Sequence, residues 1–180
     1  PLVLDFCNKC KFIQSRFITN PKNRYIEIDY AYTSSNSNYS KNHWNEFAKQ
    51  LNHKFKIKDK KILEIGSNDG YLCSLLNKFG AKTLGVDASN FMVNLSRKLG
   101  VKSIHSIFSF RESLKIRKKY ENFDIIIANN VFNHSDFPNK FLKGVSHLLK
   151  HNGTYIFEQP DFSIGAASLK FDQIYHEHVS

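Results

Sequence analysis

Cysteine is scarce in this sequence, and a long apolar run is missing altogether. The chain has 3 cysteines among 180 residues, and the two closest are Cys7 and Cys10. An odd number with one close pair excludes a disulfide-stapled scaffold and favours a reducing, cytoplasmic setting. No apolar run approaches the roughly 20 residues of a membrane-spanning helix, and no secretory signal pattern is visible. We therefore expect a protein that makes no contact with a membrane.

Acidic residues are also few relative to basic ones. The sequence has 16 aspartates and glutamates against 26 lysines and arginines, which gives a formal net charge of +10. Such an excess can indicate a nucleic acid or another anionic partner. The basic residues are scattered along the chain, however, so an ordinary lysine-rich surface is the simpler interpretation and no nucleic-acid partner is expected. An anionic small substrate is also compatible with this charge.

Apolar residues make up 41% of the chain, which is enough for a buried core. A loop at 33–40 and a helix at 42–51 precede a region in which short apolar runs alternate with helical patterns. The predicted strands are 61–66, 82–87, 101–108, 123–129 and 153–160, and the predicted helices are 71–79, 90–99, 110–120 and 136–150. Alternating strands and helices predict an α/β fold with a doubly wound, mostly parallel sheet. In such sheets the ligand binds at the carboxyl ends of the strands.

The loop after the first of these strands, "EIGSNDGYL", indicates the charge of the ligand. Gly66 and Gly70 allow close approach of the backbone, but the loop is not the G-x-G-x-x-G of dinucleotide-binding proteins. Glu64 and Asp69 would repel a pyrophosphate. A cationic ligand without phosphate suits the loop better, and S-adenosylmethionine has this character. Asp87 ends the second strand, where a carboxylate can accept hydrogen bonds from both ribose hydroxyls.

This pattern resembles the class I S-adenosylmethionine-dependent methyltransferases, which have a Rossmann-like sheet. The resemblance implies S-adenosylmethionine as the cofactor, and a nucleotide-binding sheet of another kind is the alternative. It implies these cofactor-binding residues: Glu64, Gly66, Ser67, Asn68, Asp69, Gly70, Asp87 and Asn129.

Five segments extend the resemblance over the whole chain: "PLVLDFCNKCKFIQ", "YAYTSSNSNYS", "EIGSNDGYL", "NNVFNHSDF" and "FDQIYHEHVS". Together they are similar to the sugar C-methyltransferases, which methylate C3 of dTDP-linked 4-keto-deoxyhexoses. The resemblance implies a small nucleotide-sugar substrate. It also implies three parts: half of a zinc-binding module at 1–40, a helix and linker at 41–60, and the methyltransferase domain at 61–180.

Carbon methylation beside a ketone needs a base and a group that holds the enolate oxygen. The resemblance implies His178 as the base, with Tyr175 and His134 steadying or relaying charge. It gives Glu177 the task of orienting a neighbour or holding a sugar hydroxyl. Spacing alone does not decide which of His178, Tyr175 and His134 takes the proton.

Cys7 and Cys10 form half of a four-ligand metal site. The resemblance implies a second cysteine pair further upstream, and therefore zinc in the full-length protein with an incomplete site in this chain. Cys73 is expected to be a buried apolar residue. The resemblance also implies further sheet strands after residue 180, so we expect a partial sequence that could be inactive by itself.

Three other functions stay open at this stage. The first is a class I methyltransferase that acts on another small molecule. The second is a nucleic-acid methyltransferase, although Asn129 to Phe132 lack the prolines that amino-methylating enzymes of DNA carry after the fourth strand. The third is a non-catalytic binding module that retains only the cofactor fold. The sequence does not predict the oligomeric state.

Overall fold

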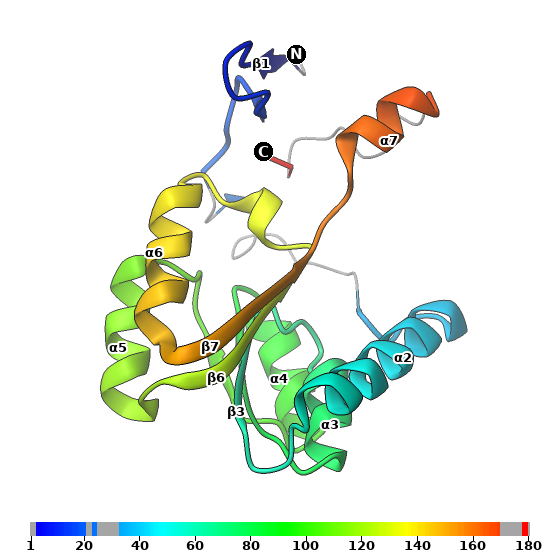
Figure 1. Cartoon of the computed structure of the whole chain (residues 1–180), viewed down its shortest axis with the longest axis vertical. Coiled ribbons are helices and arrows are strands. Elements are labelled where there is room, and N and C mark those ends of the chain that lie inside the picture. The colour runs from blue at the N-terminus through cyan, green and yellow to red at the C-terminus, as the bar shows by residue number, and fades with distance from the viewer. Residues whose placement is uncertain (1–2, 21–22, 25–32, 170–177, 180) are drawn as a thin grey trace.

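The computed structural model describes the chain except for residues 1–2, 21–22, 25–32, 170–177 and 180. Within that part, a five-stranded parallel sheet forms the centre of the molecule (Figure 1). Its strands are β3 (Lys61–Ile65), β4 (Lys82–Asp87), β5 (Ser103–His105), β6 (Phe123–Asn129) and β7 (Leu149–Glu158). Their spatial order is β5-β4-β3-β6-β7, and each neighbouring pair is parallel. The predicted doubly wound α/β fold is therefore confirmed.

The order of the strands locates the ligand edge. The chain moves outward from β3 through β4 to β5, then crosses back and continues through β6 and β7 on the other side. The direction of winding thus reverses between β3 and β6. Doubly wound sheets open a crevice at this point, beyond the carboxyl ends of the two strands.

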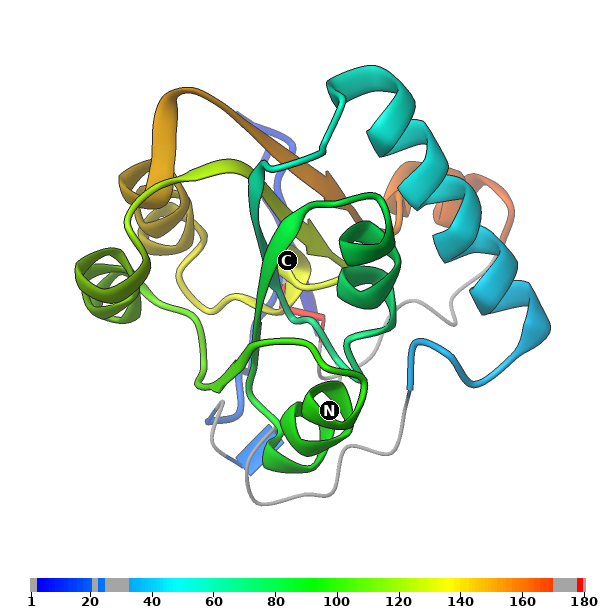
Figure 2. The same ribbon diagram turned by 90° about the horizontal axis from the view of Figure 1, so that it is seen from below.

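Helices cover both faces of the sheet, as Figure 2 shows from below. The helical elements are α2 (Asn38–Phe55), α3 (Tyr71–Lys78), α4 (Asn90–Lys98), α5 (Phe110–Tyr120), the 3-10 turn η1 (Phe132–His134), α6 (Pro138–Leu148) and α7 (Phe162–Ala167). On one face, Ile116 of α5 and Val145 of α6 pack in a core with Leu63 of β3. On the other face, Leu51 of α2 and Leu76 of α3 form a second core with the neighbouring strand residue, Ile62. Successive residues of β3 face opposite cores because side chains alternate along a strand.

A short antiparallel hairpin precedes this domain, with strands β1 (Leu4–Phe6) and β2 (Ile13–Ser15). In Figure 1 it lies beside the end of the chain and above the turn η1. Val179 connects the two regions: its carbonyl accepts a hydrogen bond from the Ser15 amide, and its amide donates to the Asn133 carbonyl, both at 2.8 Å. No helix in the described part of the chain is long and apolar enough to cross a bilayer.

The boundaries of three predicted elements were wrong. Helix α2 starts at Asn38 rather than at residue 42, because the Ser37 side chain caps it by accepting from the Ser40 amide at 3.1 Å. Helix α6 ends at Leu148 and β7 begins at the next residue, so the predicted stop signal at 151–153 lies inside a strand. The last carbonyls of α6 do not need a local glycine, because Asn122 from a distant loop donates to the carbonyl of His147 at 3.3 Å. The third predicted strand is also shorter, at Ser103–His105.

Candidate active site

The glycine loop after β3 lies at the predicted ligand edge. The amides of Gly66 and Ser67 donate to the carbonyl of Val86, at 2.7 and 3.1 Å, and so hold the loop against the end of β4. Asn129 ends β6, on the other side of the winding reversal. The fold therefore brings together the ends of β3, β4 and β6, which carry the predicted cofactor-binding residues.

Both glycines of the loop occupy positions that only glycine fits. Gly66 has φ +70°, and a Cβ there would lie 2.1 Å from Cγ2 of Val131. Gly70 has φ +78°, and a Cβ there would lie 2.2 Å from Oγ of Ser96. The left-handed conformation and the close neighbours together exclude side chains. The bare backbone is thus a consequence of how the loop packs.

The Asp87 carboxylate is held in place by two backbone amides. One carboxylate oxygen accepts from the Asn68 amide and the other from the Ser89 amide, both at 2.8 Å. Burial raises the pKa of Asp87, and the hydrogen bonds from the Ser89 and Asn68 amides oppose that shift. A carboxylate has about four acceptor positions, so this one can still accept from two hydroxyl groups. Its geometry fits the predicted contact with a ribose.

Asp87→Asn is expected to weaken S-adenosylmethionine binding by about 10- to 100-fold, since a hydrogen bond to a charged group contributes about 1.5–3 kcal/mol. The amide can accept at only one atom, so it cannot serve both backbone amides and two hydroxyls. Isothermal titration calorimetry measures the change. Asp124→Asn at the opposite end of the sheet is the control, and equal losses in both variants would contradict the assignment.

Glu64 is buried against α3 and is hydrogen-bonded by Cys73. The thiol of Cys73 donates to the Glu64 carboxyl at 3.0 Å, and both residues are buried. Burial, together with the nearby charges of Asp69 and Asp87, raises the pKa of Glu64 to about 8. Cys73 is a buried residue, as the sequence predicted. The Glu64 side chain is thus directed into the domain, and its contact with a cofactor stays a prediction.

The raised pKa of Glu64 predicts a pH dependence of stability. The folded state keeps this proton up to about pH 8, whereas an unfolded glutamate loses it near its ordinary value of 4.5. The stabilising contribution is therefore complete below that value and is lost as the pH rises through about 8. We expect the free energy of unfolding to fall by about 1.4 kcal/mol per pH unit between roughly pH 5 and 8 from this group. Urea unfolding across that range measures the slope, which Glu64→Gln should reduce by this amount; an unchanged slope would contradict the account.

A segment before α2 contacts the glycine loop, which the sequence analysis did not foresee. The Ser34 amide donates to the Asn68 side chain at 2.8 Å. The amide and hydroxyl of Ser35 donate to one carboxylate oxygen of Asp69, at 3.1 and 2.6 Å. These contacts span 34 residues, and the serine-rich stretch gave only the signal of a loop. Asn68 and Asp69 are thereby fixed by protein groups.

Several polar side chains at this edge are buried without a hydrogen-bond partner among the described residues. They are Oγ of Ser67 and both amide atoms of Asn129 and of Asn133. Buried polar groups are nearly always hydrogen-bonded in native proteins. Orphaned donors and acceptors in the segments that follow β3 and β6 are therefore positions that a polar ligand can satisfy. They fit the amine, carboxylate and hydroxyls of S-adenosylmethionine.

Two of the four predicted catalytic residues meet at the same edge. His134 ends the turn η1 that follows β6, and its ring packs edge-on against His178, with centroids 4.9 Å apart. The backbone link from Val179 to Asn133 holds His178 in this position. Tyr175 and Glu177 lie outside the described residues, so their predicted roles stay predictions.

One further polar pair joins α2 to the end of the sheet. Nε2 of His43 lies 3.1 Å from a carboxylate oxygen of Glu158, the last residue of β7. Sequence reasoning missed His43, because nothing in the helical pattern of α2 indicates which strand its polar face meets.

Cys7 and Cys10 are exposed free thiols in the hairpin turn. Hydrogen bonds from the backbone and side chain of Cys10 lower the pKa of Cys7. Among the described residues, no group of three or more histidine, cysteine or acidic side chains is arranged to hold a metal ion. The metal half-site at Cys7 and Cys10 therefore stays a prediction, and a zinc-binding module is not shown.

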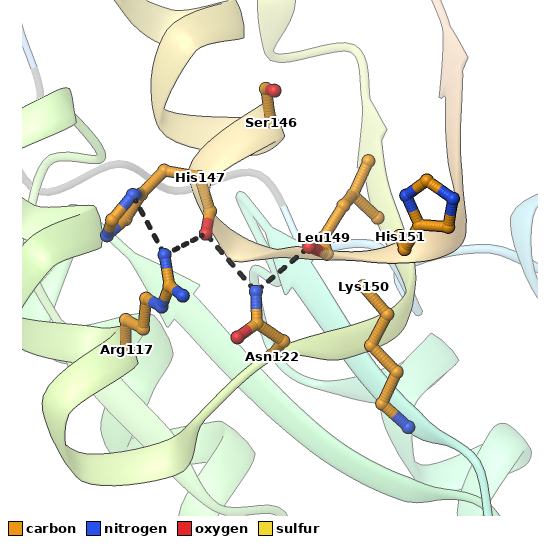
Figure 3. A pocket seen from close by; sticks show the side chains of 7 residues that line it. All are labelled: Arg117, Asn122, Ser146, His147, Leu149, Lys150 and His151. Atoms are coloured by element: carbon orange, nitrogen blue, oxygen red, sulfur yellow. Dashed lines mark hydrogen bonds between the residues drawn. The ribbon is translucent and has the colours of Figure 1, made fainter.

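A cavity of about 430 Å³ lies at the opposite edge of the sheet, between the ends of α5 and α6 (Figure 3). Two of the polar side chains that line it are hydrogen-bonded to backbone carbonyls of the protein. Arg117 and Asn122 both donate to the carbonyl of His147, and Asn122 also donates to that of Leu149 at 2.9 Å. These groups cap the carbonyl end of α6, whose negative dipole does not favour anions. This cavity is therefore structural.

The parallel sheet, its winding reversal and its glycine loop define a Rossmann-like domain for a nucleoside-containing ligand. Residues 38–180 match a family model described as a methyltransferase domain, so the chain belongs to that family. The family assignment confirms the coarser part of the prediction from sequence and leaves the substrate open.

Known proteins resemble the chain at low identity. C-methyltransferase NovU of Streptomyces niveus is 24% identical over 100% of the chain, which spans 43% of that protein. A ubiquinone biosynthesis O-methyltransferase of Bradyrhizobium diazoefficiens is 32% identical over 53% of the chain, which covers 38% of its length. The chain thus spans less than half of these curated relatives.

Solved structures support the fold. A SAM-dependent methyltransferase from Archaeoglobus fulgidus aligns with TM-score 0.61 at 16% identity, over 76% of this chain and 62% of that one. The plantazolicin methyltransferase BpumL, solved with a pentazolic desmethylPZN analogue and SAH, aligns with TM-score 0.59 at 18% identity, over 88% and 65% of the two chains. At these identities the likeness concerns the fold alone.

Proposed function

We propose that the protein transfers a methyl group from S-adenosylmethionine to C3 of a nucleotide-linked 4-keto-deoxysugar. The observation that carries the proposal is the contact between His134 and His178, whose ring centroids lie 4.9 Å apart at the ligand edge. The likeness to a C-methyltransferase over the whole of this chain supports it. Paired imidazoles suit chemistry that must remove a proton from carbon near neutral pH.

The chain's own residues would hold the cofactor as follows. Asp87 accepts from the ribose hydroxyls, and Gly66 and Gly70 let the backbone approach the ligand. The orphaned atoms of Ser67 and Asn129 bind its amino-acid end. S-adenosylmethionine, when bound, supplies an electrophilic methyl group on a positively charged sulfur.

The catalytic residues act on the sugar. A ring nitrogen of His178 takes the proton from C3, and the electron pair of the broken C–H bond moves into an enolate. The Tyr175 phenol donates a hydrogen bond to the enolate oxygen, and Glu177 holds a sugar hydroxyl. His134 packs against His178, so it orients that ring and can receive charge from it. The carbon made nucleophilic in this way accepts the methyl group.

Proton exchange in heavy water tests the proposal. The full-length protein is incubated in D₂O with a dTDP-4-keto-6-deoxyhexose, and the C3 proton is followed by NMR. Because removal of that proton precedes methylation, we expect protein-dependent deuterium uptake at C3. Methyl transfer onto an oxygen of this sugar, with no exchange at C3, would contradict the proposal.

O-methylation of a small molecule is the second candidate. The observation in its favour is the 32% identity to an O-methyltransferase over 53% of the chain. That reaction removes a proton from a hydroxyl and needs no enolate, so it predicts no exchange at a carbon beside a ketone. The same NMR experiment separates the two candidates.

The proposal also covers the compartment, the metal and the substrate of the full-length protein. We expect the protein to be cytoplasmic. We expect zinc in the full-length protein, held by Cys7 and Cys10 together with two ligands beyond this chain. The substrate is expected to be a nucleotide sugar, whose phosphates match the positive net charge of +10.

A further inference from the structure

Val179 forms a bridge between the N-terminal hairpin and the turn that carries His134. Its carbonyl accepts from the Ser15 amide and its amide donates to the Asn133 carbonyl, both at 2.8 Å. Val179 and Ser15 are each 3% exposed, so both ends of the bridge are shielded from water. The residues on either side of this bridge are the two histidines: His178 precedes Val179, and His134 follows Asn133.

The Ser15 amide is free for this task because of the hairpin register. Leu4 is paired with Ser15, and the amide of the next residue, Arg16, donates to the Val3 carbonyl across the hairpin at 2.9 Å. Alternate amides of an antiparallel strand point to opposite edges. The Ser15 amide therefore points away from β1, and Val179 pairs with the outer edge of β2.

A second contact restricts the position of the η1 turn. Arg24, whose side chain is 5% exposed, forms an ion pair with Asp136, whose side chain is 13% exposed. Asp136 lies two residues after His134. A buried arginine–carboxylate pair is geometrically demanding, so it restricts the position of the turn. The N-terminal segment is thus linked to the η1 region on both sides of His134, through Val179 at Asn133 and directly at Asp136.

We propose that the N-terminal hairpin positions the catalytic pair: the Ser15 amide, acting through Val179, holds the His178 ring against His134. Ser15, Val179 and Arg24 are positioning residues, since none of them is assigned to the substrate or the cofactor. The inference rests on the proposed function only for its effect on turnover. It gives the hairpin a role in the reaction that does not depend on whether Cys7 and Cys10 bind a metal.

Ser15→Pro removes the amide and leaves the hairpin pairing intact, because proline lacks only the outer-edge donor and is tolerated in edge strands. Ser15→Ala keeps the amide and is the conservative rescue. Ile13→Pro is the matched control, since its amide points to the same outer edge and no bond from it to Val179 exists in the described structure. Asp136→Asn weakens the ion pair with Arg24 without altering the hairpin.

Two readouts are needed in the full-length protein. The first is the NMR chemical shift of the His178 ring protons. The edge-on His134 ring changes this shift, so the His134→Ala variant gives the reference value without the neighbouring ring. The second is steady-state kinetics together with S-adenosylmethionine affinity by calorimetry. A misplacement of about 1 Å costs about 100-fold in rate, so Ser15→Pro should lose about 10- to 100-fold in kcat with unchanged cofactor affinity.

Support requires that Ser15→Pro moves the His178 resonances toward the reference and lowers kcat, while Ser15→Ala and Ile13→Pro behave as the unaltered protein. Asp136→Asn should move the same resonances part of the way, which keeps the inference testable if the proline variant does not fold. Unmoved resonances in both Ser15→Pro and Asp136→Asn would overturn it, as would equal effects of the two proline variants. If no methyl transfer to a sugar is found, the proposed function fails, but the NMR arm still decides whether the hairpin positions His178.

Discussion

Replacing His178 with alanine is expected to lower methyl transfer by about 100- to 10,000-fold, the usual contribution of a general base. Cofactor affinity should hardly change, because the residues assigned to S-adenosylmethionine lie on the ends of β3, β4 and β6. Loss of turnover with binding retained is the signature of a group that acts in the transition state. Single-turnover kinetics with labelled cofactor measures the rate, and calorimetry measures the affinity.

The controls are chosen by position. His151→Ala removes a histidine at the structural cavity between α5 and α6, far from the ligand edge, and should leave the rate unchanged. His134→Ala should reduce the rate less than His178→Ala, because in the proposed mechanism His134 orients the base. If His134→Ala were the more damaging substitution, the two roles would have to be exchanged. If neither variant lost activity, the pair would not be catalytic.

Gly66→Ala is expected to have the second large effect, on both stability and cofactor binding. A side chain at φ +70° costs about 1–2 kcal/mol. The new methyl group would also lie 2.1 Å from Cγ2 of Val131, and such overpacking adds about 1–3 kcal/mol. The loop can relieve the contact by moving away from Val131, which displaces the glycine backbone that the proposal places against the ligand. Urea unfolding and calorimetry report the two consequences.

Gly100→Ala separates the cost of the left-handed backbone conformation from the cost of crowding. Gly100 has a similar φ of +76°, but a Cβ there would meet nothing within 4 Å. It should therefore show the backbone cost alone and leave cofactor affinity unchanged. The double variant Gly66→Ala, Val131→Ala should recover the part of the stability that Gly66→Ala loses to crowding, by the logic of a double-mutant cycle. Equal destabilisation by Gly66→Ala and Gly100→Ala would show that the contact with Val131 is unimportant.

The sequence predicted the sheet well because buried parallel strands are short, continuous apolar runs. Glycines and acidic residues at the ends of these runs lie together at the carboxyl ends of β3 and β4, as the predicted strand order requires. The error at the end of α6 lies where a distant residue completes a local structure. Asn122 caps α6 from 25 residues away, and no pattern within the helix reveals that.

The sequence identified several residues of the candidate site but not the contacts that hold them in place. Residue type and position singled out Asp87, and the family resemblance pointed to His134 and His178. The structure adds the groups that hold them, which are mainly backbone atoms such as the Ser15 amide and the Asn133 carbonyl. Backbone groups are the same in every residue, so composition and motifs cannot indicate them. Glu64 differs for another reason: burial beside Cys73 makes it a neutral acid at pH 7 in this fold.

The most direct test of the proposed function is to identify the atom that receives the methyl group. The full-length protein is incubated with S-adenosylmethionine carrying a ¹³C-labelled methyl group and with a dTDP-4-keto-6-deoxyhexose, and the product is examined by NMR. The account predicts a labelled methyl carbon coupled to C3 neighbours of the sugar, absent when His178 is replaced. A label attached to oxygen or nitrogen, or an unchanged yield from the His178→Ala variant, would contradict it.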